Sequence, residues 1–323
     1  MENKKFSLLK AINDVANNRT LDERAQAVVN EGIEEMRKAG QSYSGSIVLP
    51  VEERSTIQAT LEGAGIENVP EDKLNILEPL RAKMVLSQAG ANFMTGLVGD
   101  VSIPIYSGNT VGWKGEIEAA ADGAGTFSEV TLTPKRLTAY VDVSKQFLIQ
   151  DSNSAEDMLK RDIINALAEK LEQTILGAEA GSNTKPTGIF NGVTADTTAV
   201  KYADIVNMEA TLENANVGGN ICYIVNPTAK ATLKTTSKDA GSGRFLMEGG
   251  EIDGYPVYTS SAVASKGIVM GNFEDYVIAQ WGGIDLVVDA VTQAVNGKVR
   301  LVVSGYFDAK PRRANAFVKK ILK

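Results

Sequence analysis

The chain has 323 residues, of which 43% are hydrophobic, and a formal net charge of -7 at pH 7. This length and apolar content suffice for one large domain, or two packed lobes, with a sizeable core. The sequence has no histidine and a single cysteine, Cys222, which excludes Ser-His-Asp and Cys-His catalysis, an intrachain disulfide and a zinc cluster of cysteines.

The acidic balance argues against a dedicated nucleic-acid binder, because such proteins neutralise phosphates with clustered Lys and Arg. No apolar run is long enough to cross a bilayer, and residues 1–10 lack the apolar region of a signal peptide. We therefore expect no membrane association and synthesis in the cytoplasm.

Residues 1–45 are charged and predicted to be helical. Thr20-Leu21-Asp22-Glu23 has the pattern of a capping box and precedes an apolar stripe of helical period, which Gly40 ends. Because the stripe is narrow and its flanks are acidic, the helix either covers the surface of its own chain or forms an arm that packs on a neighbour. Both alternatives stay open.

The pattern then changes to strands, predicted over Val101–Tyr106, Val111–Ile117 and an alternating run from Leu132 to Val143. Residues 118–126 between them are small, flexible and acidic, which is typical of the tip of a two-stranded excursion. Isolated hairpins are marginal in water, so we expect this excursion to rest on another subunit.

The clearest helix of the sequence is predicted from Ser154 to Leu176, with a stop at Gly177. A second helix is predicted over Ala203–Ala215, and Asn226-Pro227 should begin a third, because Asn caps an orphan N–H and Pro has none to lose. Strands are expected at Ile221–Val225, Tyr255–Tyr258, Gly267–Met270, Tyr276–Ala279, Leu286–Val288, Val299–Val303 and Ala316–Ile321. The second half thus reads as an α+β lobe, and its last two strands are expected to return beside the long helix.

Motifs for cofactor chemistry are absent from the sequence. A phosphate loop and a dinucleotide fingerprint both need glycines at fixed spacing, and the nearest approach, Gly241 to Leu246, lacks the third glycine. Acidic pairs are inevitable among 40 acidic residues, and Cys222, inside an apolar strand, is expected to be a buried and inert thiol. We expect no catalytic residue, no cofactor and no metal.

Several motifs carry a resemblance to a known family. They are, in order, Thr126-Phe127, Leu132-Thr133-Pro134, the run from Ala139 to Leu148 that leads to Asp151, the helix from Ser154, Pro186-Thr187-Gly188-Ile189, Asn226-Pro227, Leu233-Lys234, Gly243-Arg244-Phe245-Leu246, Gly254-Tyr255-Pro256-Val257 and Gly271-Asn272-Phe273. In this order and spacing they resemble the major capsid proteins of tailed phages, with the Hong Kong 97-type shell fold that encapsulins share.

The resemblance implies an α+β, Hong Kong 97-like fold. It implies an N-terminal arm and lead-in (1–100), an extended β-hairpin loop (101–147), a peripheral domain with a spine helix (148–200 and 291–323) and an axial domain (201–290). The strands from Val299 to Ile321 would both return to the peripheral domain.

The implied function is that of a shell subunit and not of an enzyme. Such a subunit assembles with itself into pentamers and hexamers of an icosahedral phage or prophage head, which encloses double-stranded DNA without sequence-specific binding. Further implied partners are scaffold, maturation protease, portal and decoration proteins, and the implied location is the virion, assembled in the cytoplasm of a bacterial host. The alternatives are an encapsulin-like nanocompartment shell and, from a different class, a small-molecule enzyme.

The resemblance also points to contact residues on two surfaces. The extended loop would contact a neighbouring subunit through Trp113, Lys114, Glu116, Glu118, Asp122 and Phe127, and the axial-lobe loop through Lys234, Arg244 and Phe245.

Two departures from the family limit what carries over. Some members crosslink subunits by an isopeptide bond between a lysine near the loop tip and an asparagine, with a catalytic glutamate in the final strands. Here no lysine lies between Glu116 and Glu129, and the glutamate position falls near Ser304, so we predict no crosslinking. The N-terminal region is also short, and whether residues 1–45 are retained or cleaved stays open.

Overall fold

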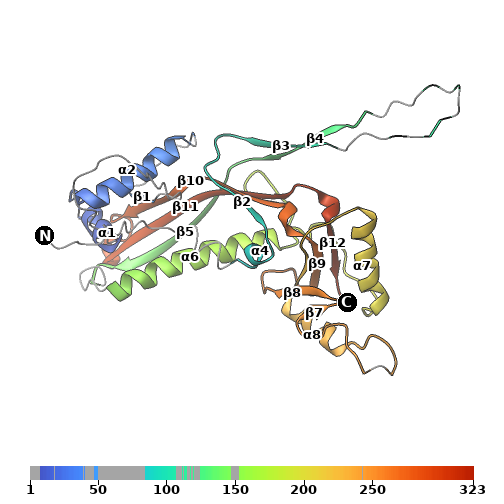
Figure 1. The fold of residues 1–323 in the computed structure, drawn as a ribbon. Helices are drawn as coiled ribbons and strands as arrows, with labels where there is room; N and C mark the ends of the chain where they lie inside the picture. Colours follow the sequence, from blue (N-terminus) through green and yellow to red (C-terminus); the bar gives the residue numbers. More distant parts are fainter. Residues whose placement is uncertain are drawn as a thin grey trace, which may run out of the picture.

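The computed structural model describes residues 8–17, 19–38, 40, 47–49, 84–106, 111, 113, 114, 117, 119, 124–146, 153–241 and 243–323. These residues form two lobes, each built on one sheet, and a two-stranded hairpin that projects away from both (Figure 1).

The first lobe is built on what we call the long sheet. Its strands run in the order β1 (Ile47–Leu49), β10 (Tyr276–Asp289), β11 (Lys298–Pro311) and β5 (Lys135–Ser144), and β2 (Asn92–Met94) pairs with β10. Pairing is antiparallel throughout except for β2, which runs parallel to β10. The helix α2 lies over one face of this sheet and α6 over the other (Figure 1).

The long helix predicted from Ser154 is α6 (Asn153–Ile175), and its existence and extent are confirmed. Its described side chains bury Ile164, Leu167, Leu171 and Ile175, a spacing of three and four residues that places them on one face. This face packs into the main hydrophobic core together with Val143 of β5.

The N-terminal region contains α1 (Leu8–Ala16) and α2 (Glu23–Lys38). The predicted capping residue was wrong by two positions, since Asp22 and not Thr20 accepts the orphan N–H, from Ala25 at 2.8 Å. A Cβ added at Gly32 would lie 2.5 Å from the carbonyl oxygen of Val48 in β1, so this glycine permits close packing. Of the two alternatives left open, the structure therefore places α2 on the sheet of its own chain.

The second lobe is built on the short sheet, in which the strands follow the order β12 (Phe317–Ile321), β9 (Gly267–Asn272), β6 (Ile221–Val225), β8 (Tyr255–Thr259) and β7 (Glu251–Ile252). The helices α7 (Tyr202–Asn214) and α8 (Pro227–Thr235) belong to this lobe (Figure 1).

Two local predictions for the second lobe are confirmed. The Asn226 side chain accepts the N–H of Thr228 at 3.0 Å, with proline at the first helical position of α8. Cys222 is buried, and burial raises the pKa of its thiol to about 12, so the thiol stays protonated and inert at neutral pH.

The structure corrects the predicted strands at two places. The strands expected at Tyr276–Ala279 and Leu286–Val288 are one strand, β10, whose register shifts between Trp281 and Asp285. Gly282 has a φ of 60° there and so accommodates the bulge. The strand expected at Val299–Val303 is longer, because β11 continues to Pro311 through buried polar residues.

The expected domain boundaries also need correction. The strand β5 belongs to the long sheet and not to the extended loop, and β10 belongs to the same sheet although it falls within 201–290. Of the two final strands, only β11 returns to the long sheet, whereas β12 pairs with β9 in the short sheet. Pairing between segments far apart in the sequence decides which sheet each strand joins. Local sequence patterns carry no information about this pairing.

Short elements complete the description. They are α4 (Val85–Gln88) and the 3-10 turns η1 (Phe273–Asp275), η2 (Ala294–Asn296) and η3 (Ala314–Ala316).

Candidate subunit-contact surfaces

The hairpin is formed by β3 (Val101–Tyr106) and β4 (Phe127–Leu132). The two strands pair antiparallel from Val101 opposite Leu132 to Tyr106 opposite Phe127, which confirms the predicted two-stranded excursion. A strand was also expected at Val111–Ile117, but Val111, Trp113, Lys114 and Ile117, the described residues of that range, are not in a strand.

Large apolar side chains of the hairpin lie in solvent. Trp113 and Ile117 are fully exposed and Phe127 is 78% exposed, and the ring of Phe127 lies 4.7 Å from that of Tyr106 between centroids. Lys114 is exposed as well, whereas Glu116, Glu118 and Asp122 lie outside the described residues. Exposed aromatic side chains gathered on a projection are typical of a surface that another molecule covers.

The root of the hairpin is held by a small apolar cluster separate from the main core. Leu132 at the end of β4 is buried with Val277, Ala279 and Trp281 of β10. The indole Nε1 of Trp281 donates to the carbonyl oxygen of Gly99, just before β3, at 2.7 Å. The cluster fixes where the hairpin leaves the lobe.

A buried ion pair lies beside this cluster, at the corner between β4 and β5. The Nζ of Lys135 lies 2.6 Å from Oδ2 of Asp308, and the two side chains are 8% and 0% exposed. The same carboxylate oxygen accepts the N–H of Thr133 at 3.0 Å, and Lys135 Nζ also donates to Oγ1 of Thr133 at 3.0 Å. Lys310 follows Asp308 by two positions on β11, and its Nζ donates to the carbonyl oxygen of Thr131 at 2.5 Å.

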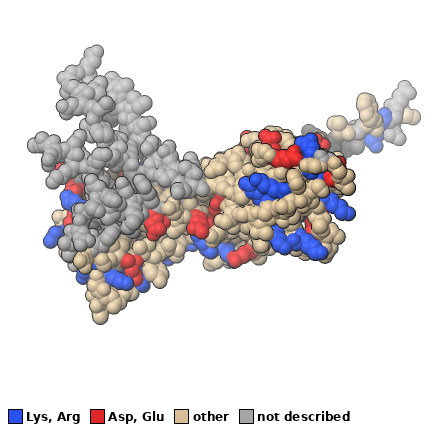
Figure 2. Space-filling model, turned by 90° about the horizontal axis from the view of Figure 1, so that it is seen from below, with Lys and Arg blue, Asp and Glu red and all other residues tan. Residues whose placement is uncertain are grey.

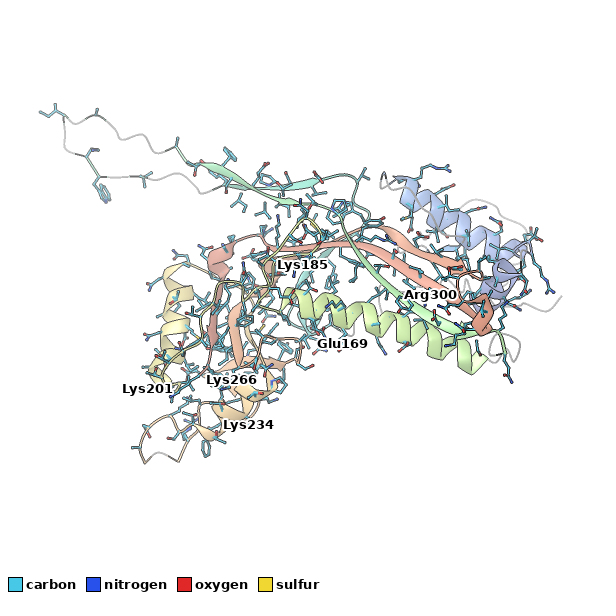
Figure 3. All side chains as sticks on the ribbon, turned by 180° about the vertical axis from the view of Figure 1, so that it is seen from behind. Glu169, Lys185, Lys201, Lys234, Lys266 and Arg300 are labelled. Atoms are coloured by element: carbon cyan, nitrogen blue, oxygen red, sulfur yellow. The ribbon has the colours of Figure 1, made fainter. Side chains whose placement is uncertain are left out.

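The face of the long sheet over β5 and β11 carries a polar and aromatic surface. The Arg300 guanidinium binds both oxygens of Asp142, at 2.7 and 2.9 Å, and lies 4.3 Å from the ring centroid of Tyr140, which is 64% exposed. The hydrogen bond from Arg300 lowers the pKa of Asp142, so this pair stays ionised at neutral pH. Arg300 lies on the long-sheet lobe, far from the labelled lysines of the other lobe (Figure 3).

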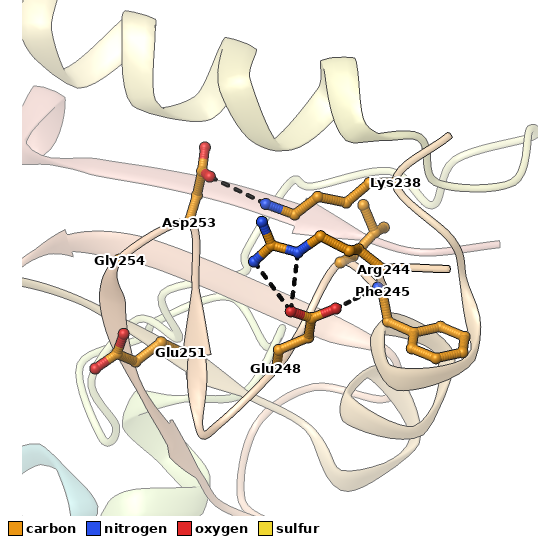
Figure 4. A pocket seen from close by; sticks show the side chains of 8 residues that line it. Lys238, Arg244, Phe245, Glu248, Glu251, Asp253 and Gly254 are labelled. Atoms are coloured by element: carbon orange, nitrogen blue, oxygen red, sulfur yellow. Dashed lines mark hydrogen bonds and ion pairs between the residues drawn. The ribbon is translucent and has the colours of Figure 1, made fainter. Parts of the chain in front are cut away.

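The end of the short-sheet lobe carries a small pocket of about 190 Å³ (Figure 4). Arg244 lies 3.1 Å from Oε2 of Glu248, the other oxygen of Glu248 accepts the N–H of Phe245 at 2.8 Å, and these bonds lower the pKa of Glu248. A lining this polar, in a volume below the roughly 300–1,000 Å³ of common ligand pockets, is not suited to a cofactor. Phe245 is 42% exposed at its rim.

The predicted contact residues of this lobe are only partly brought together. Arg244 and Phe245 both line the pocket. Lys234 is exposed in the last turn of α8 and does not line it. Figure 3 shows Lys234 and Lys201 on this lobe.

A buried carboxylate joins three segments between the lobes. Glu172 of α6 accepts the N–H of Val85 in α4 at 2.6 Å and the hydroxyl of Ser260, after β8, at 3.3 Å. Its burial raises the pKa of Glu172, because the charged form is desolvated, although the N–H donors of α4 oppose this.

A second carboxylate joins two of the places where the chain crosses between the lobes, the one before β10 and the one after β11. Asp275 of η1 binds Arg312 at 2.9 Å and also binds Arg313, both just after β11, and its side chain is 2% exposed. Sequence reasoning missed this cluster, the Glu172 contacts and the Lys135–Asp308 pair. A charged residue inside an apolar strand, such as Asp308 between Phe307 and Ala309, is the signal that could have indicated a buried pair.

The described residues contain neither a metal cluster nor a membrane-spanning helix. There, no group of three or more Asp, Glu or Cys side chains could hold a metal ion, and no helix is long and apolar enough to span a membrane. The face seen in Figure 2 shows Lys and Arg in separate patches interrupted by other residues, and not as one continuous basic groove.

Comparisons with known proteins point in one direction. The model of the Phage capsid family matches residues 70–320. The major capsid protein of Halomonas phage phiHAP-1 is 28% identical over 326 aligned residues, which cover 97% of this chain and 53% of that protein. The major capsid protein of Klebsiella oxytoca phage phiKO2 is 24% identical, over 70% of this chain and 58% of its own length. The chain thus spans little more than half the length of these two relatives.

Solved structures share the fold. The capsid of a native GTA particle aligns with a TM-score of 0.58 at 16% identity, covering 84% of this chain and 95% of that one. A structure from Mycobacterium phage Bobi aligns with the same TM-score at 10% identity, with the same two coverages.

Proposed function

The chain belongs to the phage capsid family and has the Hong Kong 97-type fold, and from this premise we propose that it is the major capsid protein of a tailed double-stranded DNA phage or prophage. In this proposal copies of the chain assemble into pentamers and hexamers of an icosahedral head. The head encloses the genome without sequence-specific contacts, and the chain has no enzymatic role. Scaffold, maturation protease, portal and decoration proteins are its further partners, and it is made in the bacterial cytoplasm before it resides in the virion.

The observation that carries the proposal is the projecting hairpin. Its strands bury little, and Trp113, Ile117 and Phe127 are left in solvent by their own chain. A two-stranded ribbon of this kind gains stability only against a third surface. A neighbouring copy provides one, since a heterologous contact repeated around a ring closes the ring.

The acceptor surface in this proposal is the face of the long sheet that carries Tyr140, Asp142 and Arg300. Tyr140 is well exposed, and the guanidinium over its ring leaves a flat aromatic and cationic surface. Aromatic and arginine side chains are enriched at protein interfaces. The long-sheet lobe is then peripheral, and the short-sheet lobe, with Lys234, Arg244 and Phe245, is axial and faces the centre of each ring.

The test is negative-stain electron microscopy of the full chain, expressed alone and purified by size exclusion. Closed shells, or rings of five and six copies, support the proposal. The matched variant replaces Trp113 and Phe127 by serine and should abolish rings and shells. A parent chain that stays monomeric, both alone and when produced together with the other head proteins of its phage, would contradict the proposal.

A further inference from the structure

The corner between β4 and β5 is where the hairpin separates from the long sheet. Thr133 and Pro134 at this corner belong to neither sheet, since β4 pairs with β3 and β5 pairs with β11. The polar backbone groups of such a corner need other partners when they are partly buried. Three side chains supply them here, Lys135, Asp308 and Lys310, which we call the root clamp.

The root clamp contacts the end of β4 and the corner that follows it. The carboxylate of Asp308 accepts the N–H of Thr133, and Lys310 donates to the carbonyl oxygen of Thr131 in β4. Lys135 closes the arrangement, because its ammonium contacts Asp308 and the Thr133 hydroxyl together. The hairpin is thus tied to β11 through charged side chains, at positions where no backbone pairing between β4 and β11 exists.

A buried ion pair is a poor source of stability, because desolvation of two charges offsets their attraction and apolar replacements are often as stable. It is, however, demanding in geometry, since charge and hydrogen bonds are satisfied together in only one arrangement. An apolar root alone, such as the cluster around Trp281, permits several packings of similar energy.

We propose that the root clamp is a positioning device that fixes the direction of the hairpin relative to the long sheet, so that each copy presents its hairpin to a neighbour at one angle. The relevance for a neighbour rests on the proposed function, but the fixed direction is a property of the single chain. It predicts that loss of the charges loosens the hairpin without unfolding the lobes.

The experiment measures the direction of the hairpin itself. Cysteines introduced as Phe127→Cys on β4 and Val295→Cys on η2 carry spin labels, and both positions are exposed, whereas the native Cys222 is buried and stays unlabelled. Pulsed electron paramagnetic resonance then gives the distribution of distances between hairpin and lobe in the full chain before assembly.

The test variant combines Lys135→Met with Asp308→Asn, which keeps a side-chain oxygen for the Thr133 N–H and removes both charges. A matched control combines Lys238→Met with Asp253→Asn, an ion pair of 3.2 Å on the short-sheet lobe. We expect one narrow distance distribution in the parent and the control, and a broad or multiple distribution in the test variant at a melting temperature close to that of the parent.

A distribution as narrow in the test variant as in the parent would overturn the proposal. If the double variant does not fold, Lys310→Met serves in its place, because it removes one tie without burying an unpaired charge, and it should also broaden the distribution. Assembly of the parent chain is tested separately by microscopy. If the chain does not form shells, the distance measurement still decides whether the root clamp fixes the direction of the hairpin.

Discussion

The carboxylate of Glu172 accepts the backbone N–H of Val85 at 2.6 Å, although the two residues are 87 positions apart in the sequence. This bond attaches α4, which leads toward the hairpin, to α6, while the other oxygen of Glu172 holds Ser260 of the second lobe.

Glu172→Gln should change the pH dependence of stability more than stability itself. Burial raises the folded-state pKa of Glu172 above its ordinary value of 4.5, so between the two values the folded chain binds more protons than the unfolded chain. Stability from this group therefore falls as pH rises through that window. The glutamine keeps an oxygen for Val85 and should flatten this slope, which urea unfolding at several pH values measures. Equal slopes in both chains would contradict the assignment.

Glu172→Ala removes the acceptor as well as the charge. It leaves the N–H of Val85 without its partner, and a buried donor left unsatisfied costs about 1–3 kcal/mol. The free energy of unfolding at neutral pH should fall by that amount for alanine and by less for glutamine. A loss as large for glutamine would mean that the charge, and not the hydrogen bond, matters.

Lys135→Met should be among the most destabilising single substitutions of the chain. It leaves Asp308, which is fully buried, as an uncompensated charge, and breaking a buried pair from one side costs roughly 3–5 kcal/mol. The paired exchange with Asp308→Asn should recover most of this loss. Chemical denaturation of the two variants gives the comparison, and additive losses would show that the two side chains do not act together.

Gly32→Ala tests the packing of α2 on its own chain. Alanine would ordinarily favour a helix by up to about 1 kcal/mol over glycine, but here its Cβ would meet Val48 at 2.5 Å. We expect a net loss of about 1–3 kcal/mol, as for other overpacked sites. Gly218→Ala is the control, because nothing lies within 4 Å of its added Cβ. A stabilised Gly32→Ala chain would indicate that α2 does not pack on β1.

Assembled shells boiled in detergent should release monomers. By the family resemblance, the glutamate position of crosslinking members falls near Ser304, which is 3% exposed and accepts hydrogen bonds from Arg136 at 3.0 and 3.2 Å. A serine hydroxyl held in this way cannot act as the carboxylate base that amide formation from a lysine needs. Electrophoresis is the measurement, and a ladder of covalent multimers would refute this.

Local patterns predicted the elements that local forces determine. The strand Ile221–Val225 and the start of α8 at Asn226-Pro227 were predicted where they occur, because an apolar run and a cap are complete within a few residues. The continuation of β11 beyond Val303 was missed, because its polar residues Ser304, Asp308 and Lys310 interrupt the apolar run by which the strand was predicted. Likewise the two strands predicted at Tyr276–Ala279 and Leu286–Val288 are one strand, because the interruption between them is a bulge inside β10.

The features of the candidate surfaces also differ in whether the sequence could predict them. The family resemblance placed Trp113 and Phe127 on the extended loop as contact residues, and both are exposed, whereas packing inside the chain would be the default for a tryptophan in a strand-like segment. The root clamp could not be predicted from the sequence. Lys135 and Asp308 are 173 positions apart, and no pattern in either segment identifies the other as its partner. The membership of β12 in the short sheet is equally a matter of long-range pairing.

The junction around Asp275 has a consequence for how a closed container of such subunits could curve. The chain passes between the lobes through η1 and again after β11, and the single carboxylate of Asp275 binds both passages. Because one buried anion ties these two crossings together, we expect this junction to resist bending. In the proposed shell, the difference in curvature between five-fold and six-fold positions is then expected to be absorbed at the contacts between subunits and in the projecting hairpins.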